Sequence, residues 1–260
     1  MSSYSTAQAP APWVRVVAPV TVGLVILGLW FVVVDVLHAA PRALPSPVAI
    51  VGEIAAHYDI ILEDMGITAS NALLGLAAGA VIAIVLAALA ATFRPVDGML
   101  APLVAAIAVV PIVALTPILN TMFGASSQFG RMSVAAIAAF VPIFVNVLRG
   151  LRQTRPVHRD LLRASAASPW QTFSVLTLPT ALPYLLTGLR IASSVAVIAA
   201  LVAEYFGGPS DGIGTAIATY AKSGRAALAF AYVAGGVAIG LAFFLVTGLL
   251  ERLVSRRKSA

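Results

Sequence analysis

Long stretches of apolar residues without a charged side chain dominate this sequence. Residues 65–93, which lie between Asp64 and Arg94, and residues 226–250, which follow Arg225, show the pattern most clearly. About 20 consecutive apolar residues are enough for a helix to cross the hydrocarbon core of a bilayer. These stretches therefore predict membrane-spanning helices.

Six such spans can be placed along the sequence. They are predicted between Arg15 and Asp35 and at about residues 65–93, 99–123, 132–148, 182–206 and 226–250. Residues 164–189 also carry few charges, but their Ser and Thr residues and the prolines at 169, 179 and 183 predict a loop with short helices. The predicted fold class is all-α, a polytopic membrane bundle of six helices.

Composition excludes a soluble globular protein. Hydrophobic residues make up 60% of the 260 residues and charged residues 10%, against about 25% charged in an average soluble domain. The absence of cysteine excludes disulfides, thiolate metal sites and cysteine nucleophiles. The net charge of +6 lies beside the apolar stretches, so anionic lipid head groups explain it better than nucleic acid.

Lys and Arg are divided unequally between the two sides of the predicted bundle. With the N-terminus inside, eleven lie on the inner side and four on the outer side, namely Arg42, Arg131, Lys222 and Arg225. Because cytoplasmic loops carry an excess of Lys and Arg, both termini are predicted to be cytoplasmic.

The sequence has room for a single domain. Residues 1–12 are rich in Ser, Ala and Pro and are predicted to be disordered, residues 13–255 form the transmembrane domain, and residues 256–260 form a basic tail. On the outer side, residues 44–64 predict an amphipathic helix on the membrane surface. On the inner side, residues 149–179 form the longest loop.

This inner loop is the most informative segment. It holds five arginines, and its pattern predicts two short helices, the first at about residues 157–166. The second begins with Ser168 as N-cap and Pro169 at the first helical position, and ends at Pro179. The residues alone leave two functions open: a contact that receives movement from another protein, or an amphipathic segment that binds anionic lipid.

Polar residues inside the predicted spans are costly unless they are paired or face water. The candidates for lining a solute path are Thr116, Asn120, Asn146, Ser193 and Ser194. For the serines, hydrogen bonding between helices is the favoured alternative. Arg190 is interpreted as structural or as part of a gate, because its long side chain can reach the inner interface. Glu204 is interpreted as a solvated helix end rather than as a contact for a binding protein or a solute.

Prolines and glycines add two further expectations. The prolines at 102, 111, 117 and 142 fit ordinary kinks, which we favour, or a broken backbone beside a pathway. Gly75-x-x-x-Gly79 and Gly236-x-x-x-Gly240 permit close helix approach, which we expect within the subunit rather than between subunits.

No motif for nucleotide binding, metal binding or catalysis is visible. The sequence has no Gly-x-x-x-x-Gly-Lys-Ser/Thr phosphate loop, and His38, His57 and His158 have no metal-ligand spacing. No catalytic residue, metal or cofactor is therefore predicted in this chain. If a nucleotide drives transport, another chain must bind ATP and Mg²⁺.

The inner loop resembles the EAA loop of the permease subunits of bacterial binding-protein-dependent ABC importers. That pattern is Glu-Ala-Ala, three residues, Gly-Ala-Ser, and an aromatic stretch ending in Leu-Pro, and it aligns with Asp160-Leu161-Leu162, Ala166-Ala167-Ser168, Trp170, Phe173 and Leu178-Pro179. In this sequence Asp replaces Glu, two leucines replace the alanines, and Ala166 replaces Gly. Residues 44–47 and 186–191 are similar to the nitrate/sulfonate/taurine branch, and residues 203–209 to members that move riboflavin or thiamine-pyrimidine precursors.

The resemblance covers about residues 44–255 and implies a type I ABC importer permease fold in the bacterial plasma (inner) membrane, without enzymatic activity. It implies two ATP-binding cassette subunits, a second permease subunit that is a copy or a paralogue, an external solute-binding protein and surrounding membrane lipids, but no nucleic acid. The residues expected to contact the ATP-binding subunit are Asp160, Leu161, Leu162, Arg163, Ala166, Ala167, Ser168 and Trp170.

The predicted function is that of the transmembrane subunit of an ATP-driven importer for a small solute. The solute would be a sulfonate-, nitrate- or taurine-like anion, or a riboflavin or thiamine-pyrimidine precursor. Two rival classes are a secondary transporter or channel driven by an ion gradient, and a membrane scaffold that moves no solute. The gradient-driven rival requires carboxylates near the membrane midplane, whereas Asp35 and Glu204 lie at the ends of spans.

Overall fold

The computed structural model describes residues 14–37, 44–124, 127–207 and 211–256, so the predicted disordered residues 1–12 and the tail after residue 256 lie outside it. The described part is helical and contains no strand. Five stretches are long and apolar enough to span a membrane: α1 (Val14–Phe31) with η1 (Val32–Val36), α3 (Tyr58–Thr92), α6 (Gln128–Arg152), α9 (Leu178–Phe206) together with the short helices before it, and α11 (Ala226–Arg256). The all-α membrane fold is confirmed.

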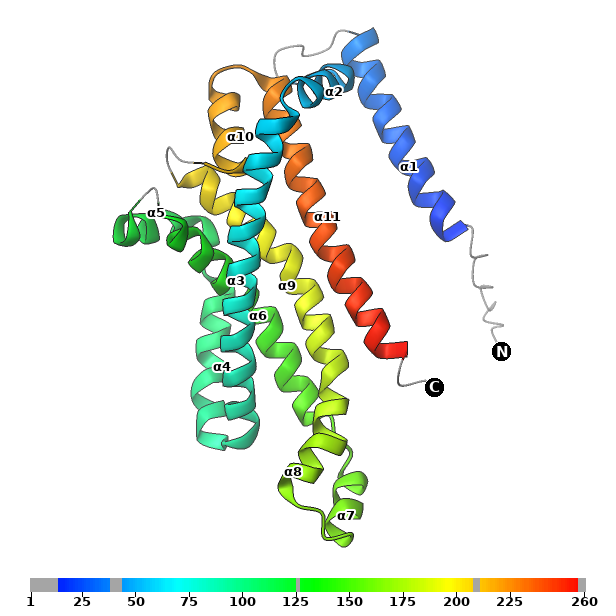
Figure 1. Cartoon of the computed structure of the whole chain (residues 1–260), viewed down its shortest axis with the longest axis vertical. Helices are drawn as coiled ribbons and strands as arrows, with labels where there is room; N and C mark the ends of the chain where they lie inside the picture. The colour runs from blue at the N-terminus through cyan, green and yellow to red at the C-terminus, as the bar shows by residue number, and fades with distance from the viewer. Residues whose placement is uncertain (1–13, 38–43, 125–126, 208–210, 257–260) are drawn as a thin grey trace, which may run out of the picture.

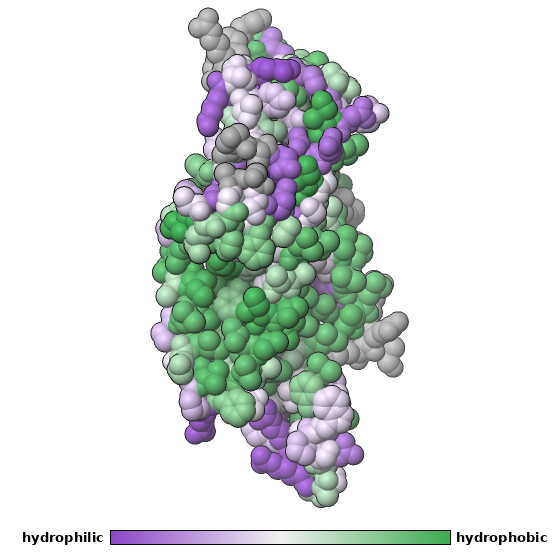
Figure 2. All heavy atoms as spheres, turned by 60° about the vertical axis from the view of Figure 1, so that its left-hand side comes forward, coloured by the Kyte–Doolittle hydropathy of each residue, from purple (hydrophilic) through white to green (hydrophobic). Residues whose placement is uncertain are grey.

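The arrangement of the helices has two distinct ends. Figure 1 shows the long helices side by side, with α7 (Pro156–Ala164) and α8 (Pro169–Thr172) at one end, and α2 (Pro47–Ala56) and α10 (Ile213–Lys222) at the other. In Figure 2 apolar side chains form a broad band around the middle, while hydrophilic ones gather at both ends. This distribution fits a bilayer around the band, and we call the two ends the α7 end and the α2 end.

Small residues allow α3, α6 and α9 to pack closely as a core. A Cβ added at Gly79 of α3 would lie 2.5 Å from the Ala136 carbonyl oxygen of α6, and one at Gly188 of α9 would lie 3.0 Å from Asn146 Cβ. Gly75 meets Ala135 in the same way, so the expected packing of Gly75 and Gly79 within the subunit is confirmed. The fully buried positions of this core are mostly alanines, including Ala72, Ala83, Ala87, Ala135, Ala139, Ala192, Ala196 and Ala200.

The third predicted span is two helices rather than one kinked helix. α4 (Arg94–Val109) and α5 (Ile112–Phe123) meet at 97°. Pro111 lacks a backbone N–H, and the residue before a proline is driven out of the helical region. Val110 accordingly adopts an extended conformation, with φ −68° and ψ 124°. The favoured interpretation as an ordinary kink is wrong at this position.

The fifth span begins earlier than predicted. α8 continues through a π-helical turn, η2 (Phe173–Thr177), into α9, so residues 169–206 form one continuous helical segment. The Leu178 amide donates to the Phe173 carbonyl across this wide turn, and Pro179, which has no backbone N–H, directly follows the turn. The expected helix end at Pro179 is therefore wrong.

The segment at the α2 end is also divided differently from the prediction. A break at His57, with φ −127°, separates α2 from α3, which starts at Tyr58 rather than near residue 65. Residues 44–64 are thus a short surface helix followed by the first turns of a span. Sequence reasoning also missed α10, which packs against α9 and α11.

Glu204 is fully buried, which overturns its interpretation as a solvated helix end. Its carboxylate accepts hydrogen bonds from Thr68 Oγ1 at 2.8 Å and from Asn71 Nδ2 at 3.2 Å, both on α3. It also accepts one from the backbone amide of Gly214 on α10, at 3.0 Å. A carboxylate in an apolar interior needs such partners, and the polar positions on one face of α3 were the signal that could have revealed it.

Polar side chains around Glu204 also cap the N-terminus of α10. The Gly212 amide donates to Asp64 Oδ1 at 2.9 Å, and the Ile213 amide donates to Thr68 Oγ1 at 2.9 Å. The first amides of a helix lack partners within the helix. Here side chains from α3 and α9 accept hydrogen bonds from these amides, which fixes α10 to the core.

An ion pair reinforces this end of the bundle. Arg131, whose side chain is only 1% exposed, places Nη1 2.7 Å from Asp211 Oδ1 and also donates to the Asp211 backbone carbonyl. Gln128 Nε2 donates to both carboxylate oxygens of Asp211. The pair joins the start of α6 to the segment that leads into α10.

We predict that Gly79→Ala destabilises the protein, because the added methyl group meets backbone of α6 rather than a movable side chain. The matched control is Gly66→Ala, in the same helix, where nothing lies within 4 Å of the added Cβ. Replacing Gly by Ala in an open helix position gains up to about 1 kcal/mol. Thermal unfolding in detergent should show a lower melting temperature for Gly79→Ala only; equal shifts in both variants would contradict the close contact.

The Asp211 ion pair predicts a loss of stability in acid. The hydrogen bond from the Arg131 guanidinium lowers the pKa of Asp211. A carboxyl group whose pKa is lower in the folded than in the unfolded state stabilises the fold above its unfolded pKa, and this is lost as pH falls through the folded pKa. The melting temperature should therefore drop below about pH 4, and Asp211→Asn should reduce that drop, while the exposed Glu63→Gln should not. An acid profile unchanged in Asp211→Asn would contradict the prediction.

Candidate functional site

α7 projects from the end of the bundle (Figure 1), and none of its residues is buried. Large apolar side chains are nevertheless exposed on α7 and at the start of α8: Val157 and Trp170 keep 72% of their surface and Leu161 keeps 65%. Apolar surface of this kind, bordered by polar groups, indicates a contact with a partner or a membrane. We refer to residues 156–172 as the tip.

Basic side chains border the apolar ones on the tip. Arg159 and Arg163 line a cavity of about 360 Å³ together with Thr172 and Phe173. Asp160 lies 3.5 Å from Arg163 Nη1, and both side chains are largely exposed. An exposed pair of this kind contributes little to stability, so these charges are available to another molecule.

The turn after α7 has the hydrogen bonds of a Schellman motif. The Ala167 amide donates to the Leu162 carbonyl, and the Ala166 amide donates to the Arg163 carbonyl, both at 3.0 Å. Ala166 has a φ of 53°, the left-handed conformation that glycine adopts most readily. This is the position at which the EAA pattern has glycine, so the alignment of Ala166 with that glycine has a physical basis.

The helix after this turn starts as predicted from the sequence. Ser168 Oγ accepts from the Gln171 amide at 3.2 Å, and the Gln171 side chain accepts from the Ser168 amide at 2.7 Å. This reciprocal pair is a capping box, and Pro169 occupies the first helical turn. Ser168 as N-cap is confirmed, and the tip has a defined shape without help from a partner.

Both ends of the tip are connected to the core. Gly150, at the end of α6, lies so close to α9 that an added Cβ would be 3.0 Å from Ala181 Cα. Arg152 Nη2 lies 2.8 Å from Asp97 Oδ1 of α4 and donates to the Ala90 carbonyl of α3. On the other side, α8 is continuous with α9. The tip is therefore attached to the core helices on both sides.

The five residues selected for a solute path lie on three helices, α5, α6 and α9. Thr116 is buried on α5, Asn120 Nδ2 donates to the Gly207 carbonyl at 3.1 Å, and Asn146 Nδ2 donates to the Pro142 carbonyl at 2.7 Å. Ser193 is buried and donates to the Arg190 carbonyl. Ser194 lines a cavity of about 430 Å³ between α9, α10 and α11 that none of the other four lines.

Arg190 connects α9 to α11 through polar contacts. Its Nη1 lies 3.1 Å from Glu251 Oε2, and its Cζ lies 4.2 Å from the centre of the Phe244 ring. Thr187 Oγ1 donates to the other oxygen of Glu251 at 2.8 Å. Pairing removes much of the cost of a charge within a span, which agrees with the structural interpretation of Arg190; its partner Glu251 was missed.

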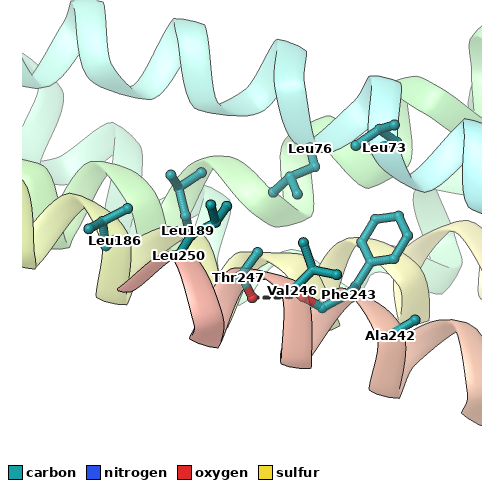
Figure 3. Close-up of a pocket in the computed structure, with 9 residues that line it drawn as sticks. All are labelled: Leu73, Leu76, Leu186, Leu189, Ala242, Phe243, Val246, Thr247 and Leu250. Atoms are coloured by element: carbon teal, nitrogen blue, oxygen red, sulfur yellow. Dashed lines mark hydrogen bonds between the residues drawn. The ribbon is translucent and has the colours of Figure 1, made fainter. Parts of the chain in front are cut away.

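An apolar cavity of about 420 Å³ lies between α3, α9 and α11 (Figure 3). Leucines from all three helices line it, and Thr247 is its one polar lining residue. The Thr247 hydroxyl donates to the Phe243 carbonyl at 2.7 Å, the dashed line in Figure 3. A polar solute finds no set of partners in this cavity.

In the described part of the chain, no three His, Asp or Glu side chains gather as they would to hold a metal ion.

The conformation of Ala166 generates a local prediction. The left-handed conformation costs a non-glycine residue about 1–2 kcal/mol, so Ala166→Gly should stabilise the turn and Ala166→Val should weaken it. Hydrogen exchange should slow about fivefold at the amides of residues 166 and 167 in Ala166→Gly, the equivalent of about 1 kcal/mol, and quicken in Ala166→Val. Identical exchange in all three proteins would contradict the assigned turn.

Known proteins share this sequence pattern and fold. Residues 66–260 match the family described as "Binding-protein-dependent transport system inner membrane component". The formylaminopyrimidine transport permease protein ThiX of Halalkalibacterium halodurans is 35% identical over 175 residues, which cover 67% of this chain and 69% of the relative. The putative aliphatic sulfonates transport permease protein SsuC of Bacillus subtilis is 27% identical over 246 residues, covering 90% and 83%.

A solved structure of the methionine ABC transporter MetNI in inward-facing conformations has the same fold, with a TM-score of 0.65 at 18% identity. The similarity covers 76% of this chain and 98% of the chain in that structure. The family match extends over most of the described helices, including the tip and the core. This chain therefore belongs to the family of inner membrane components of binding-protein-dependent transport systems, the permease subunits of ABC importers.

Proposed function

We propose that the tip seats on an ATP-binding cassette subunit and that this contact drives import of a small solute. The observation that carries the proposal is that α7 is fixed in shape by its own turn and cap, yet buries none of its residues. The tip lies at one end of the long helices (Figure 1), beyond the apolar band that Figure 2 shows around the middle. A segment that served only to bind lipid would lie along that band.

The chemistry of the tip suits a protein groove. Leu161 and Trp170 supply exposed apolar surface, and Arg163 with Asp160 supplies charges of both signs. Leu162, Ala166, Ala167 and Ser168 contribute mainly the shape of the turn. Apolar anchors surrounded by polar groups are typical of protein interfaces.

The proposed mechanism is alternating access driven from outside this chain. Two ATP-binding subunits bind ATP and Mg²⁺ and close; the tip moves with them; and the helical segment 169–206 carries the movement into the core. Because α3, α6 and α9 are closely packed, the subunit tilts largely as one body rather than bending. ATP binding thereby favours one of two pre-existing orientations of the path.

Orientation and partners follow from the position of the tip. ATP is cytoplasmic, so the α7 end faces the cytoplasm of a bacterial cell and the α2 end faces outward. The start of α1 and the end of α11 point toward the same end as the tip (Figure 1), which supports a cytoplasmic position for both termini. A second permease subunit, a copy or a paralogue, completes the path, and an external solute-binding protein docks on the α2 end.

Of the residues proposed for the path, Asn120, Asn146 and Ser194 keep part of their surface accessible. Thr116 and Ser193 are buried, so they would contact solute only in another state of the transporter. The solute is proposed to be an organic anion such as a sulfonate, or a pyrimidine- or riboflavin-like heterocycle. The names of the similar permeases SsuC and ThiX support these two classes.

Coupling predicts that Leu161→Glu separates ATP hydrolysis from transport. The side chain is 65% exposed, so the charge should leave folding intact while opposing a protein contact at the tip. In proteoliposomes with the ATP-binding subunits and binding protein, solute moved per ATP should fall at least tenfold. Leu161→Met is the matched control and should keep the wild-type ratio; a wild-type ratio in Leu161→Glu would contradict the coupling role.

A further inference from the structure

A polar cavity of about 630 Å³ lies at the α2 end, away from the tip and the residues proposed for the path. It is formed between the start of α2 and the turn that joins α10 to α11. Its lining includes Ser46, Ala49 and Glu53 on one side and Gly224, Arg225 and Leu228 on the other. Figure 1 shows these two segments next to each other at the top of the bundle.

One part of this cavity suits an anion. The Arg225 side chain is 50% exposed, and its Nη2 lies 3.9 Å from Glu53 Oε2, beyond hydrogen-bonding distance. The N-terminus of α2 also faces the cavity, where Ser46 Oγ caps the Val48 amide at 3.1 Å and Ala49 contributes to the lining. An arginine beside a helix N-terminus favours phosphate.

The opposite part suits a cation. Glu53 lies on the same face of α2 as Ser46 and Ala49, at helical spacing. Its Oε2 lies 3.1 Å from His57 Nδ1, a contact that is an ion pair only when the imidazole is protonated, and among the described residues no well-aligned hydrogen bond reaches this oxygen. Among the described residues, the guanidinium of Arg225 is the one fixed positive charge within 4 Å of this carboxylate, and it lies beyond hydrogen-bonding distance. The carboxylate can therefore accept a hydrogen bond from a donor with a positive charge.

Aromatic residues place the cavity at the depth of lipid head groups. Trp30 and Tyr220 are partly exposed near the α2 end; Trp30 packs edge to face on Phe230 with ring centroids 6.0 Å apart, and Tyr220 stacks at 5.5 Å on Tyr232, which is buried. Trp and Tyr concentrate where the hydrocarbon core meets the head groups. Val51 on α2 is 65% exposed, as expected for a helix lying in that interface.

We propose that this cavity binds the head group of a phospholipid that carries both a phosphate and a protonated primary amine. The phosphate lies between Arg225 and the N-terminus of α2 at Ser46, and the ammonium group donates to Glu53. Each charged group of the lipid then lies beside a side chain of opposite charge. A head group without an amine brings no donor to Glu53, and a quaternary ammonium has no N–H to donate to it.

The test is native mass spectrometry of the full chain in its assembled complex. Phosphatidylethanolamine, phosphatidylglycerol and phosphatidylcholine with identical acyl chains are added at equal concentration to detergent-solubilised protein. The ethanolamine lipid should give at least threefold more adduct than either of the others. Glu53→Gln and Arg225→Gln should each remove this preference, whereas Glu63→Gln and Lys222→Gln, exposed charges at the same end, should keep it.

A soluble competitor separates a lipid from a free zwitterion. Glycerophosphoethanolamine has the same head group without acyl chains, and at equal concentration it should not displace the lipid. Displacement would assign the cavity to a soluble zwitterion, and equal adducts for the three lipids, or an unchanged preference in Glu53→Gln and Arg225→Gln, would overturn the proposal. The readout is lipid mass, so it is independent of coupling to an ATP-binding subunit.

Discussion

Close contact between helices at glycine and alanine residues is the constraint on which this structure depends. In a bilayer the surrounding lipid is as apolar as the side chains, so burial alone gives helices little reason to associate. Glycine and alanine at the α3–α6 and α6–α9 contacts bring backbones close enough for van der Waals attraction to act. The same closeness makes the core resist bending, and a stiff core can pass on a movement applied at its end.

The tip is useful only because it is attached to that core at both ends. α6 leads into it after Gly150, and the helical segment 169–206 leaves it without a break. Polar side chains also connect the helices at two levels of the bundle. Glu204 and Arg131 hold α10 to the core at the α2 end, while Arg190 and Glu251 hold α11 to α9 within the spans. The contact proposed for the ATP-binding subunit thus lies on α7, which buries none of its residues.

Much of this could be predicted from sequence because the underlying rules are local. Charge-free stretches of sufficient length identify spans, and Ser168-Pro169 predicts a helix start because capping depends on adjacent residues. The effect of a proline could not be predicted from such local rules. Pro111 ends a helix within a span, whereas the helix continues past Pro179 after a π-helical turn. Both look alike in sequence, and packing against neighbouring helices decides between them. Glu204 was misjudged for a similar reason, since its partners lie over 130 residues away.

The central claim, that the tip receives movement from an ATP-binding subunit, is tested most directly by photocrosslinking in the assembled transporter. A photoreactive phenylalanine analogue at Trp170, which is 72% exposed, should form an adduct with the ATP-binding subunit. The same analogue at Val51, on α2 at the opposite end, should form none with it. Adducts at Trp170 with lipid alone, in a complex that hydrolyses ATP and moves solute, would contradict the account.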